Sequence, residues 1–144
     1  MTTDGFLLDT NVVSELVAAA PAPQVLGWMA ARRPDRLFLS VITLGELTKG
    51  VARLDGGRKR ERLIRWLAED LPAQFAGRML PLDQAVAIRW GEMMAEAARR
   101  GRPRPAVDLQ IAATAAHLGL GLATRNIVDF EDLGLVIVNP WEMS

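Results

Sequence analysis

The residues best suited to chemistry in this chain are four acids that lie far apart in the sequence: Asp9, Glu46, Asp108 and Asp129. Each lies where a predicted strand has just ended or a predicted helix has just begun. In a sheet of parallel strands all the carboxyl ends lie on one edge, so side chains distant in sequence converge there. Two carboxylates about 4 Å apart repel by roughly 4 kcal/mol at an effective dielectric near 20, so a cluster of four needs a cation. Because oxygen-only ligands suit Mg²⁺ or Mn²⁺, the pattern predicts a metal site.

Each acid also has a purely structural interpretation. Asp9 fits a turn after a strand, and the segment Thr43 to Glu46 fits a capping box, in which Glu46 would bond to the amide of the cap residue. Asp108 and Asp129 lie near the starts of helical segments, where the macrodipole favours a carboxylate by roughly 0.3–1 kcal/mol. Capping does not require all four acids to follow strand ends on one edge of a sheet, so the joint pattern favours the metal site.

The elements that would position these acids alternate between strands and helices. Apolar runs predict strands over residues 6–8, 36–41, 79–82, 120–124 and 136–138. Helical spacing predicts helices over residues 12–17, 25–32, 43–54, 58–75, 83–100 and 106–117, and a short helical turn over 129–132. Pro72 is expected to bend or shorten the fourth of these, and Asp83 to cap the fifth. This order predicts an α/β fold, a three-layer α/β/α sandwich around a mostly parallel five-stranded sheet.

Composition bounds the class of protein. A chain of 144 residues is long enough for one compact domain. It has no cysteine, which excludes disulfides, thiolate nucleophiles and thiolate metal sites. The N-terminus does not fit a signal peptide and no apolar stretch reaches the length of a membrane span, so we expect a cytoplasmic protein with no membrane partner. Basic and acidic residues number 17 each, so any binding of nucleic acid must depend on local basic patches.

Four segments resemble, in the correct order, the successive signatures of PIN-domain ribonucleases of the VapC toxin family, in particular its FitB-like branch. They are Leu7-Leu-Asp-Thr-Asn-Val-Val-Ser-Glu15, Ser40-Val-Ile-Thr-Leu-Gly-Glu46, Asp108-Leu-Gln-Ile-Ala-Ala-Thr-Ala115 and Thr124-Arg-Asn-Ile-Val-Asp-Phe130. The resemblance extends from Phe6 to Trp141 and includes Arg78-Met-Leu-Pro-Leu-Asp83 and Asn139-Pro-Trp141. It implies a single PIN domain over residues 1–144.

The resemblance also implies a function. It implies the toxin of a type II toxin–antitoxin system, an Mg²⁺- or Mn²⁺-dependent endoribonuclease that a VapB-type antitoxin inhibits. Asp9, Glu46 and Asp108 match the three core acids of the family, and Asp129 matches the fourth. The implied assembly is a homodimer, or a higher assembly with the antitoxin. Some PIN domains carry an acid at the position of Asn126, so this chain has one fewer negative charge with which to hold a second metal ion.

Neutral and basic residues near the acids are candidates for supporting roles. Residues that could orient metal ligands or a bound water, or serve as helix caps, are Thr10, Asn11, Thr124 and Asn126. A basic segment before Asp108 is a candidate for binding RNA phosphates, with a solvated loop as the alternative; it contains Arg99, Arg100, Arg102 and Arg104. His117, the one histidine, suits a helix C-terminus better than catalysis.

The tryptophans are expected in the core or at its flank: Trp28, Trp66, Trp90 and Trp141. Partner binding is the alternative for the first two. The apolar helices on either side of Pro21 and Pro23 resemble the region where family members accept the antitoxin, which predicts that Leu16, Val17 and Trp28 are covered in the complex.

Three other functions are alternatives to a nuclease. A phosphatase of the haloacid dehalogenase type needs a second aspartate two residues after the first, where this chain has Asn11, and neither it nor a receiver domain has a suitably placed lysine here. A catalytically silent PIN-fold scaffold in a DNA-bound regulatory complex is the stronger alternative, although the presence of all four acids argues against it.

Overall fold

A parallel sheet forms the centre of the computed structural model, which describes residues 3–142. The strands of this part of the chain are β1 Phe6–Leu8, β2 Leu37–Ser40, β3 Met79–Leu80, β4 Gly121–Ala123 and β5 Ile137–Val138. They are arranged in the order β3-β2-β1-β4-β5, and every neighbouring pair is parallel. In the central strand, Leu7 is aligned with Phe38 of β2 and with Leu122 of β4. The carboxyl ends of all five strands therefore lie on one edge.

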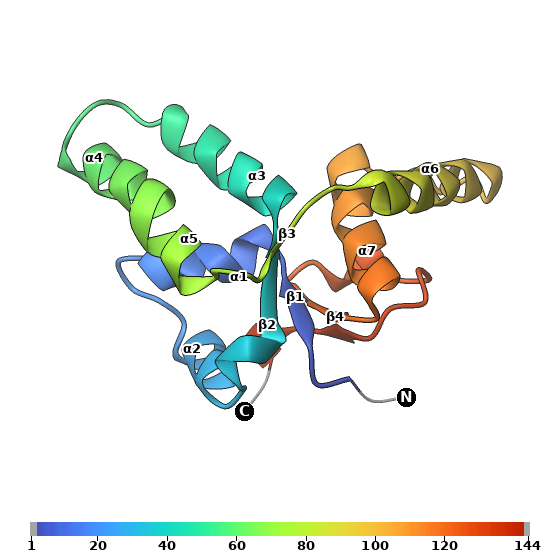
Figure 1. Cartoon of the computed structure of the whole chain (residues 1–144), viewed down its shortest axis with the longest axis horizontal. Coiled ribbons are helices and arrows are strands. Elements are labelled where there is room, and N and C mark those ends of the chain that lie inside the picture. Colours follow the sequence, from blue (N-terminus) through green and yellow to red (C-terminus); the bar gives the residue numbers. More distant parts are fainter. Residues whose placement is uncertain (1–2, 143–144) are drawn as a thin grey trace.

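Helices cover both faces of this sheet (Figure 1). One face carries α1 Thr10–Ser14, α2 Pro23–Ala30, α3 Val41–Ala52, α4 Arg58–Arg65 and α5 Leu71–Gln74. The other face carries α6 Gln84–Arg99 and α7 Ala106–Leu118, which pack on each other. The predicted three-layer α/β/α sandwich is confirmed. None of the helices formed by residues 3–142 combines the length and the apolarity needed to span a bilayer.

Alternation along the strands creates two cores, because successive side chains point to opposite faces of a sheet. Phe6 and Leu8 pack with the layer of α1–α5, whereas Leu7 packs with α7. Leu7 and Leu8 are fully buried, and burying such a side chain contributes roughly 1.5–3 kcal/mol. As predicted, α7 is buried along most of its length, from Leu109 to Ala115 apart from the partly exposed Gln110. β1, which Asp9 directly follows, and α7, which contains Asp108, are thus among the most firmly packed elements.

The helix predicted over residues 58–75 is interrupted. It consists of α4, a π-helical turn over Trp66–Asp70, and α5, whose first turn contains Pro72. The N–H of Leu71 donates to the carbonyl of Trp66, five residues earlier. A proline has no N–H and its ring collides with the carbonyl four residues back in a regular helix, so the wider turn accommodates Pro72. Trp66 and Leu67 remain buried in the core.

Several boundaries differ from prediction by one to three residues. The helix expected to start at Thr43 starts at Val41, because the hydroxyl of Ser40 accepts a hydrogen bond from the N–H of Ile42 (3.0 Å). Asp83 caps α6 as expected, accepting from the N–H of Val86 (2.9 Å). Gly119 ends α7 in the left-handed conformation (φ 67°), which glycine adopts without strain.

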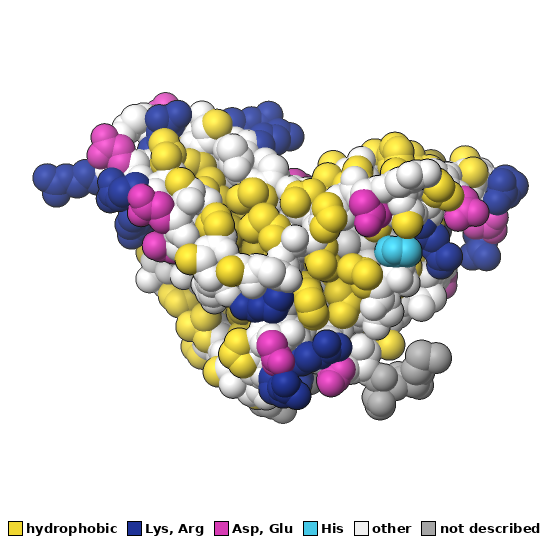
Figure 2. All heavy atoms as spheres, in the orientation of Figure 1, with side chains coloured by type: hydrophobic (Ala, Val, Ile, Leu, Met, Phe, Trp, Pro, Cys, Tyr) yellow, Lys and Arg dark blue, Asp and Glu magenta, His cyan; other side chains and the backbone are white. Residues whose placement is uncertain are grey.

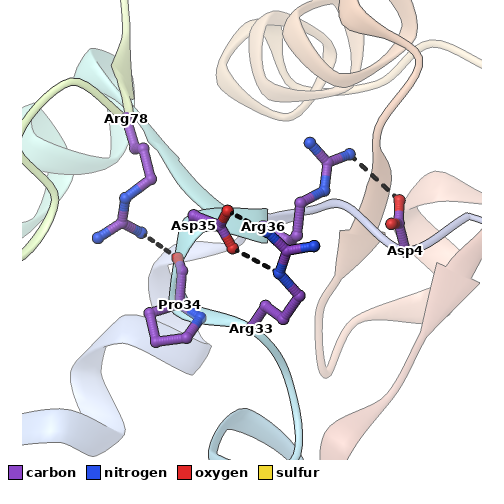
Figure 3. A network of polar contacts seen from close by, with 6 residues as sticks. All are labelled: Asp4, Arg33, Pro34, Asp35, Arg36 and Arg78. Atoms are coloured by element: carbon purple, nitrogen blue, oxygen red, sulfur yellow. Dashed lines mark hydrogen bonds and ion pairs between the residues drawn. The ribbon is translucent and has the colours of Figure 1, made fainter.

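Arginines tie together the segments that precede the strands (Figure 3). The guanidinium of Arg78, before β3, donates to the carbonyls of Pro34, Leu37 and Gln74. Arg36 pairs with Asp4 (3.2 Å), and Arg33 pairs with Asp35 (2.6 Å). We call these five charged residues the amino-end edge: Asp4, Arg33, Asp35, Arg36 and Arg78.

Candidate active site

Asp9 is the most buried acid at the opposite edge of the sheet. It directly follows β1, caps α1, and is 6% exposed. Its carboxylate accepts hydrogen bonds from the N–H of Thr10 (2.9 Å) and the hydroxyl of Thr124 (2.7 Å). Burial raises the pKa of Asp9, as do the charges of Glu46 and Asp129, while these hydrogen bonds oppose the rise. Asp9 is therefore both a helix cap and a carboxylate held rigidly at the end of the central strand.

Glu46 lies on α3, which follows β2 directly. Its Oε1 accepts a hydrogen bond from the hydroxyl of Thr10 (2.6 Å), so it faces α1. The capping-box interpretation of Glu46 is wrong. Ser40 is the cap, which places Glu46 well inside the helix, and the buried hydroxyl of Thr43 has no hydrogen-bond partner among residues 3–142.

Asp108 and Asp129 come from the other side of the sheet. Asp108 lies in the first turn of α7, as predicted, and Asp129 is exposed in the 3-10 turn Ile127–Phe130. The pKa of Asp108 is raised to about 6, first by burial and then by the charges of Asp129, Asp9 and Glu46, with Arg104 acting in the opposite direction. The charges of Glu46 and Asp129 act on both Asp9 and Asp108, which shows that the fold brings all four acids together at the carboxyl ends of the strands. We call them the acid cluster.

Three of the four neutral candidates touch the acid cluster through their side chains. Thr10 donates to Glu46 and Thr124 donates to Asp9, while the amide of Asn11 is 3.4 Å from Oδ2 of Asp9. Asn126 acts through its backbone, since its N–H donates to the hydroxyl of Thr124 (3.0 Å). The carboxylates of Asp9 and Glu46 are thus oriented by donors on neighbouring residues.

The acid cluster fits a divalent cation by its chemistry. All its donors are carboxylate oxygens, the type that Mg²⁺ and Mn²⁺ prefer. Burial is the main cause of the raised pKa values of Asp9 and Asp108, and a cation would relieve the repulsion from neighbouring acids that adds to it. Within residues 3–142, however, no three acidic or histidine side chains are already arranged as a complete ligand set. Binding an ion would therefore require side chains such as Glu46 to turn toward Asp9. The role of the cluster as metal ligands remains a prediction.

The four candidate arginines are not equivalent. Arg99 and Arg100 both bind the carboxylate of Glu96, at 2.6 and 2.9 Å. Arg102 binds Asp132 (2.6 Å) and approaches Glu131 (3.6 Å). Arg104 donates to the backbone carbonyl of Asp129 (3.3 Å). Of the four, Arg104 is the one whose contacts link it directly to the acid cluster.

The prediction that Trp28 is covered by an antitoxin is wrong. Trp28 is 5% exposed in the chain itself, packs edge-on against Phe6 with ring centroids 5.2 Å apart, and carries the guanidinium of Arg32 4.7 Å from its ring. The spacing of α2 indicated an apolar face but not the element that covers it. In the structure, Phe6 of β1 covers this face. Leu16 and Val17 are partly buried against the same core.

All four tryptophans, Trp28 included, agree with the expected core or flank positions. Trp66 is 8% exposed, which excludes partner binding for it, and Trp141 is partly buried against the same core. Trp90 is partly exposed and donates to the carbonyl of Ala106 (3.2 Å). His117 is exposed in the last turn of α7, at the opposite end of that helix from Asp108.

The chain belongs to the PIN domain family, whose model matches residues 6–134. It is similar to the VapC ribonuclease Y4jK of Sinorhizobium fredii, with 40% identity over 136 residues, 94% of this chain and 97% of that protein. It is also similar to the toxin FitB of Neisseria gonorrhoeae, with 38% identity over 135 residues, again 94% of this chain and 97% of the relative. The resemblance stated from the sequence is confirmed.

Solved structures agree with this assignment. The crystal structure of FitAcB from Neisseria gonorrhoeae superposes with a TM-score of 0.89 at 37% identity, covering 96% of this chain and 99% of that one. The structure of FitAB bound to an IR36 DNA fragment gives a TM-score of 0.89 at 34% identity, covering 96% and 97%. The PIN fold therefore extends over nearly the whole chain.

Proposed function

We propose that this protein is the toxin of a toxin–antitoxin pair and that it hydrolyses RNA internally with the help of Mg²⁺ or Mn²⁺. The observation that carries the proposal is the acid cluster: four carboxylates from distant segments meet at one edge, and burial and mutual repulsion raise the pKa of Asp9 and Asp108. Relatives named VapC ribonuclease and toxin FitB support the same function.

The chain supplies the framework for this chemistry. Asp9, Glu46 and Asp108 would hold the ion, and Asp129, which is exposed, would contact it directly or through a water. A divalent ion in such a site lowers the pKa of a water and neutralises charge that grows on the scissile phosphate. Thr124 and Thr10 keep Asp9 and Glu46 oriented while this happens. No side chain of the protein needs to act as a nucleophile.

The pKa of Asp108 gives this reaction a pH dependence. With a folded-state pKa of about 6, Asp108 is largely protonated below that pH and ionised above it. Metal binding needs the ionised form, so metal affinity and cleavage should rise as the pH increases through this region. The bound ion would in turn shift the pKa of Asp108 downward.

The proposed partner is a VapB-type antitoxin, and the proposed setting is the cytoplasm. The likeness to the FitAcB and FitAB complexes supports a partner of this kind, and we further propose that the toxin forms a homodimer within that complex. Because Trp28 and Trp66 are buried within the chain, neither is the anchor of the antitoxin interface.

The proposal is tested with purified protein and RNA. Cleavage should require Mg²⁺ or Mn²⁺, stop with a chelator, and leave a 5′-phosphate and a 3′-hydroxyl. Asp9→Asn should abolish it, whereas Asp35→Asn, which removes an exposed acid from the amino-end edge, should not. Products with a cyclic phosphate in the presence of chelator would contradict the proposal, because they indicate attack by the ribose 2′-hydroxyl.

A second function has one observation in its favour. A structure with 34% identity to this chain contains a FitAB complex bound to DNA, and this observation favours a purely regulatory, DNA-bound role as the second candidate. RNA cleavage distinguishes the two functions. A silent scaffold would not cleave RNA even as the wild type, and it would keep antitoxin and DNA binding after Asp9→Asn.

A further inference from the structure

A hollow of about 370 Å³ lies between α6 and the segment that follows Asp129. Its charged lining consists of Arg89, Arg99, Arg100, Arg102, Arg104, Glu92, Glu96 and Asp132. Five arginines and three acids leave it with a net charge of +2. Met93, Ala97 and Leu133 form its apolar part. Basic and acidic side chains gather around the far end of α6 in Figure 2.

The arginines of this hollow divide into two groups. Arg99 and Arg100 share Glu96, whose pKa they lower mainly through the hydrogen bond from Arg99, and Arg102 is held by Asp132. Arg89 and Arg104 form no ion pair with any residue of 3–142. The paired arginines shape the wall, while these two keep donors available for an incoming anion.

Arg104 joins the hollow to the acid cluster. It lines the hollow, and its guanidinium donates to the carbonyl of Asp129 (3.3 Å). An anion held by Arg104 would therefore lie next to the acid cluster, and Arg89 lines the same hollow. A chain of evenly spaced phosphates satisfies both neighbouring sites at once, which a single small anion does not.

We propose that this hollow is a phosphate subsite, in which Arg89 and Arg104 bind the RNA backbone next to the scissile phosphodiester while the apolar part contacts the attached nucleoside. Guanidinium groups suit phosphate oxygens because they offer paired donors in a plane. Contacts to phosphate position the strand and carry no base specificity. The inference rests on the proposed ribonuclease function and adds to it a binding site separate from the acids.

The test uses binding as well as cleavage, with a fluorescein-labelled single-stranded RNA of mixed sequence as the probe. Binding to the full chain is measured by anisotropy in Ca²⁺ over a range of salt concentrations, and cleavage of the same RNA is measured in Mg²⁺. Arg89→Gln removes the charge at an exposed helix position, where glutamine is well tolerated. Arg53→Gln is the matched control, because Arg53 is also exposed, forms no ion pair within residues 3–142, and lies at the end of α3 in the other helical layer.

We expect Arg89→Gln to weaken RNA binding about fivefold and to reduce the slope of log K against log salt by about 0.7, the value for one phosphate contact to a single strand. Arg53→Gln should change neither quantity. An unchanged slope in Arg89→Gln, an equal loss in Arg53→Gln, or the absence of RNA binding by the wild type overturns the subsite. A loss of antitoxin binding with RNA binding intact also overturns it, since the hollow would then hold an acidic protein segment.

The design separates this inference from the function on which it rests. In an Asp9→Asn background, RNA should still bind, and adding Arg89→Gln should weaken binding by the same factor. If the wild type binds RNA through Arg89 but never cleaves it, the subsite stands and the proposed hydrolysis fails. If cleavage is normal and Arg89→Gln has no effect on binding, the hydrolysis stands and the subsite fails.

Discussion

At the amino-end edge of the sheet Arg33 and Arg36 are matched by carboxylates and Arg78 by carbonyls, whereas at the carboxyl-end edge four acids accumulate beside Arg104. Matched charges hold segments in place, and their donors and acceptors are already used and so are not available to a ligand. Unmatched charges cost folding free energy and persist where a ligand is to neutralise them. The comparison indicates that the first edge serves stability and the second serves function, and each prediction below tests one side of it.

The largest effect is expected at Asp9. Asp9→Asn should lower kcat/KM for RNA by about a hundredfold or more, because it removes a charged oxygen ligand from the centre of the cluster. The variant should remain folded, since burial already disfavours the ionised form of Asp9. Cleavage assays and circular dichroism on the same sample check both points. An unfolded variant would make Asp9 a structural cap first and a ligand second.

The hydroxyl of Thr124 should matter next most. Thr124→Val keeps the shape of a fully buried side chain but removes the 2.7 Å donor to Asp9, so metal affinity should fall about 10- to 100-fold. Mn²⁺ binding followed by electron paramagnetic resonance measures this. Thr124→Ser should restore most of the affinity. Equal affinity in Thr124→Val and the wild type would mean that the hydroxyl does not position the acid.

On the other edge, a change should affect stability and spare the chemistry. Arg78→Met keeps a long side chain beside Phe75, whose ring lies 4.9 Å from the guanidinium, but it removes the hydrogen bonds that the guanidinium donates to three carbonyls. The free energy of unfolding should fall by about 2 kcal/mol in urea denaturation. Activity per folded molecule should be unchanged. A large loss of kcat without loss of stability would break the distinction between the edges.

Asp108→Asn should have a smaller, pH-dependent effect on the metal-free protein. The pKa of Asp108 rises from 3.8 in the unfolded reference to about 6 in the fold, so its ionisation weakens folding as the pH increases between these values. The variant should match the wild type at about pH 4 and exceed it above about pH 6, by about 1 kcal/mol after allowance for solvent screening. Thermal unfolding in chelator measures the difference. Equal stabilities of Asp108→Asn and the wild type at every pH would show that the fold does not raise the pKa of Asp108.

The smallest effect is expected for the exposed pair of the amino-end edge. The side chains of Arg33 and Asp35 are 75% and 59% exposed, and such pairs contribute little because water and salt screen them. Arg33→Gln should change the free energy of unfolding by less than about 0.5 kcal/mol and leave activity unaltered. A loss comparable to that of Arg78→Met would mean that this pair belongs to the structural network of the edge.

Much of the fold follows from local patterns in the sequence. The alternation of strands and helices gave the α/β class, and the nearly uniform apolar character of residues 106–117 indicated the buried helix α7. The π-helical turn before Pro72 was not evident, because a proline signals a disturbance without stating whether the helix ends, bends or widens. The start of α3 was misplaced because Ser40 and Thr43 are both capping residue types, and only the packing of β2 selects Ser40.

The site shows the same division between local and tertiary information. Asp9, Glu46, Asp108 and Asp129 could be placed at one edge because parallel strands fix where their carboxyl ends lie. The burial of Trp28 matches the core position expected for the tryptophans, but the residue that covers it could not be foreseen, since spacing reveals an apolar face and not its neighbour. Arg89 could not be predicted as a binding residue for a related reason. Its spacing from Glu96 and Arg100 places the three on one face of a helix. The opposite wall of the hollow comes from Asp132 and Leu133, which lie on a segment far along the chain.

The most direct test of the central claim is a titration of the wild type, Asp108→Asn and Asp35→Asn with Mn²⁺ at about pH 5 and about pH 8. The wild type and Asp35→Asn should bind Mn²⁺ well at the higher pH and much more weakly at the lower one, because Asp108 with a pKa of about 6 must lose its proton first. Asp108→Asn should bind weakly at both. Equal binding by all three proteins, or binding that is independent of pH in the wild type, would contradict the account of the carboxyl-end edge as a metal site.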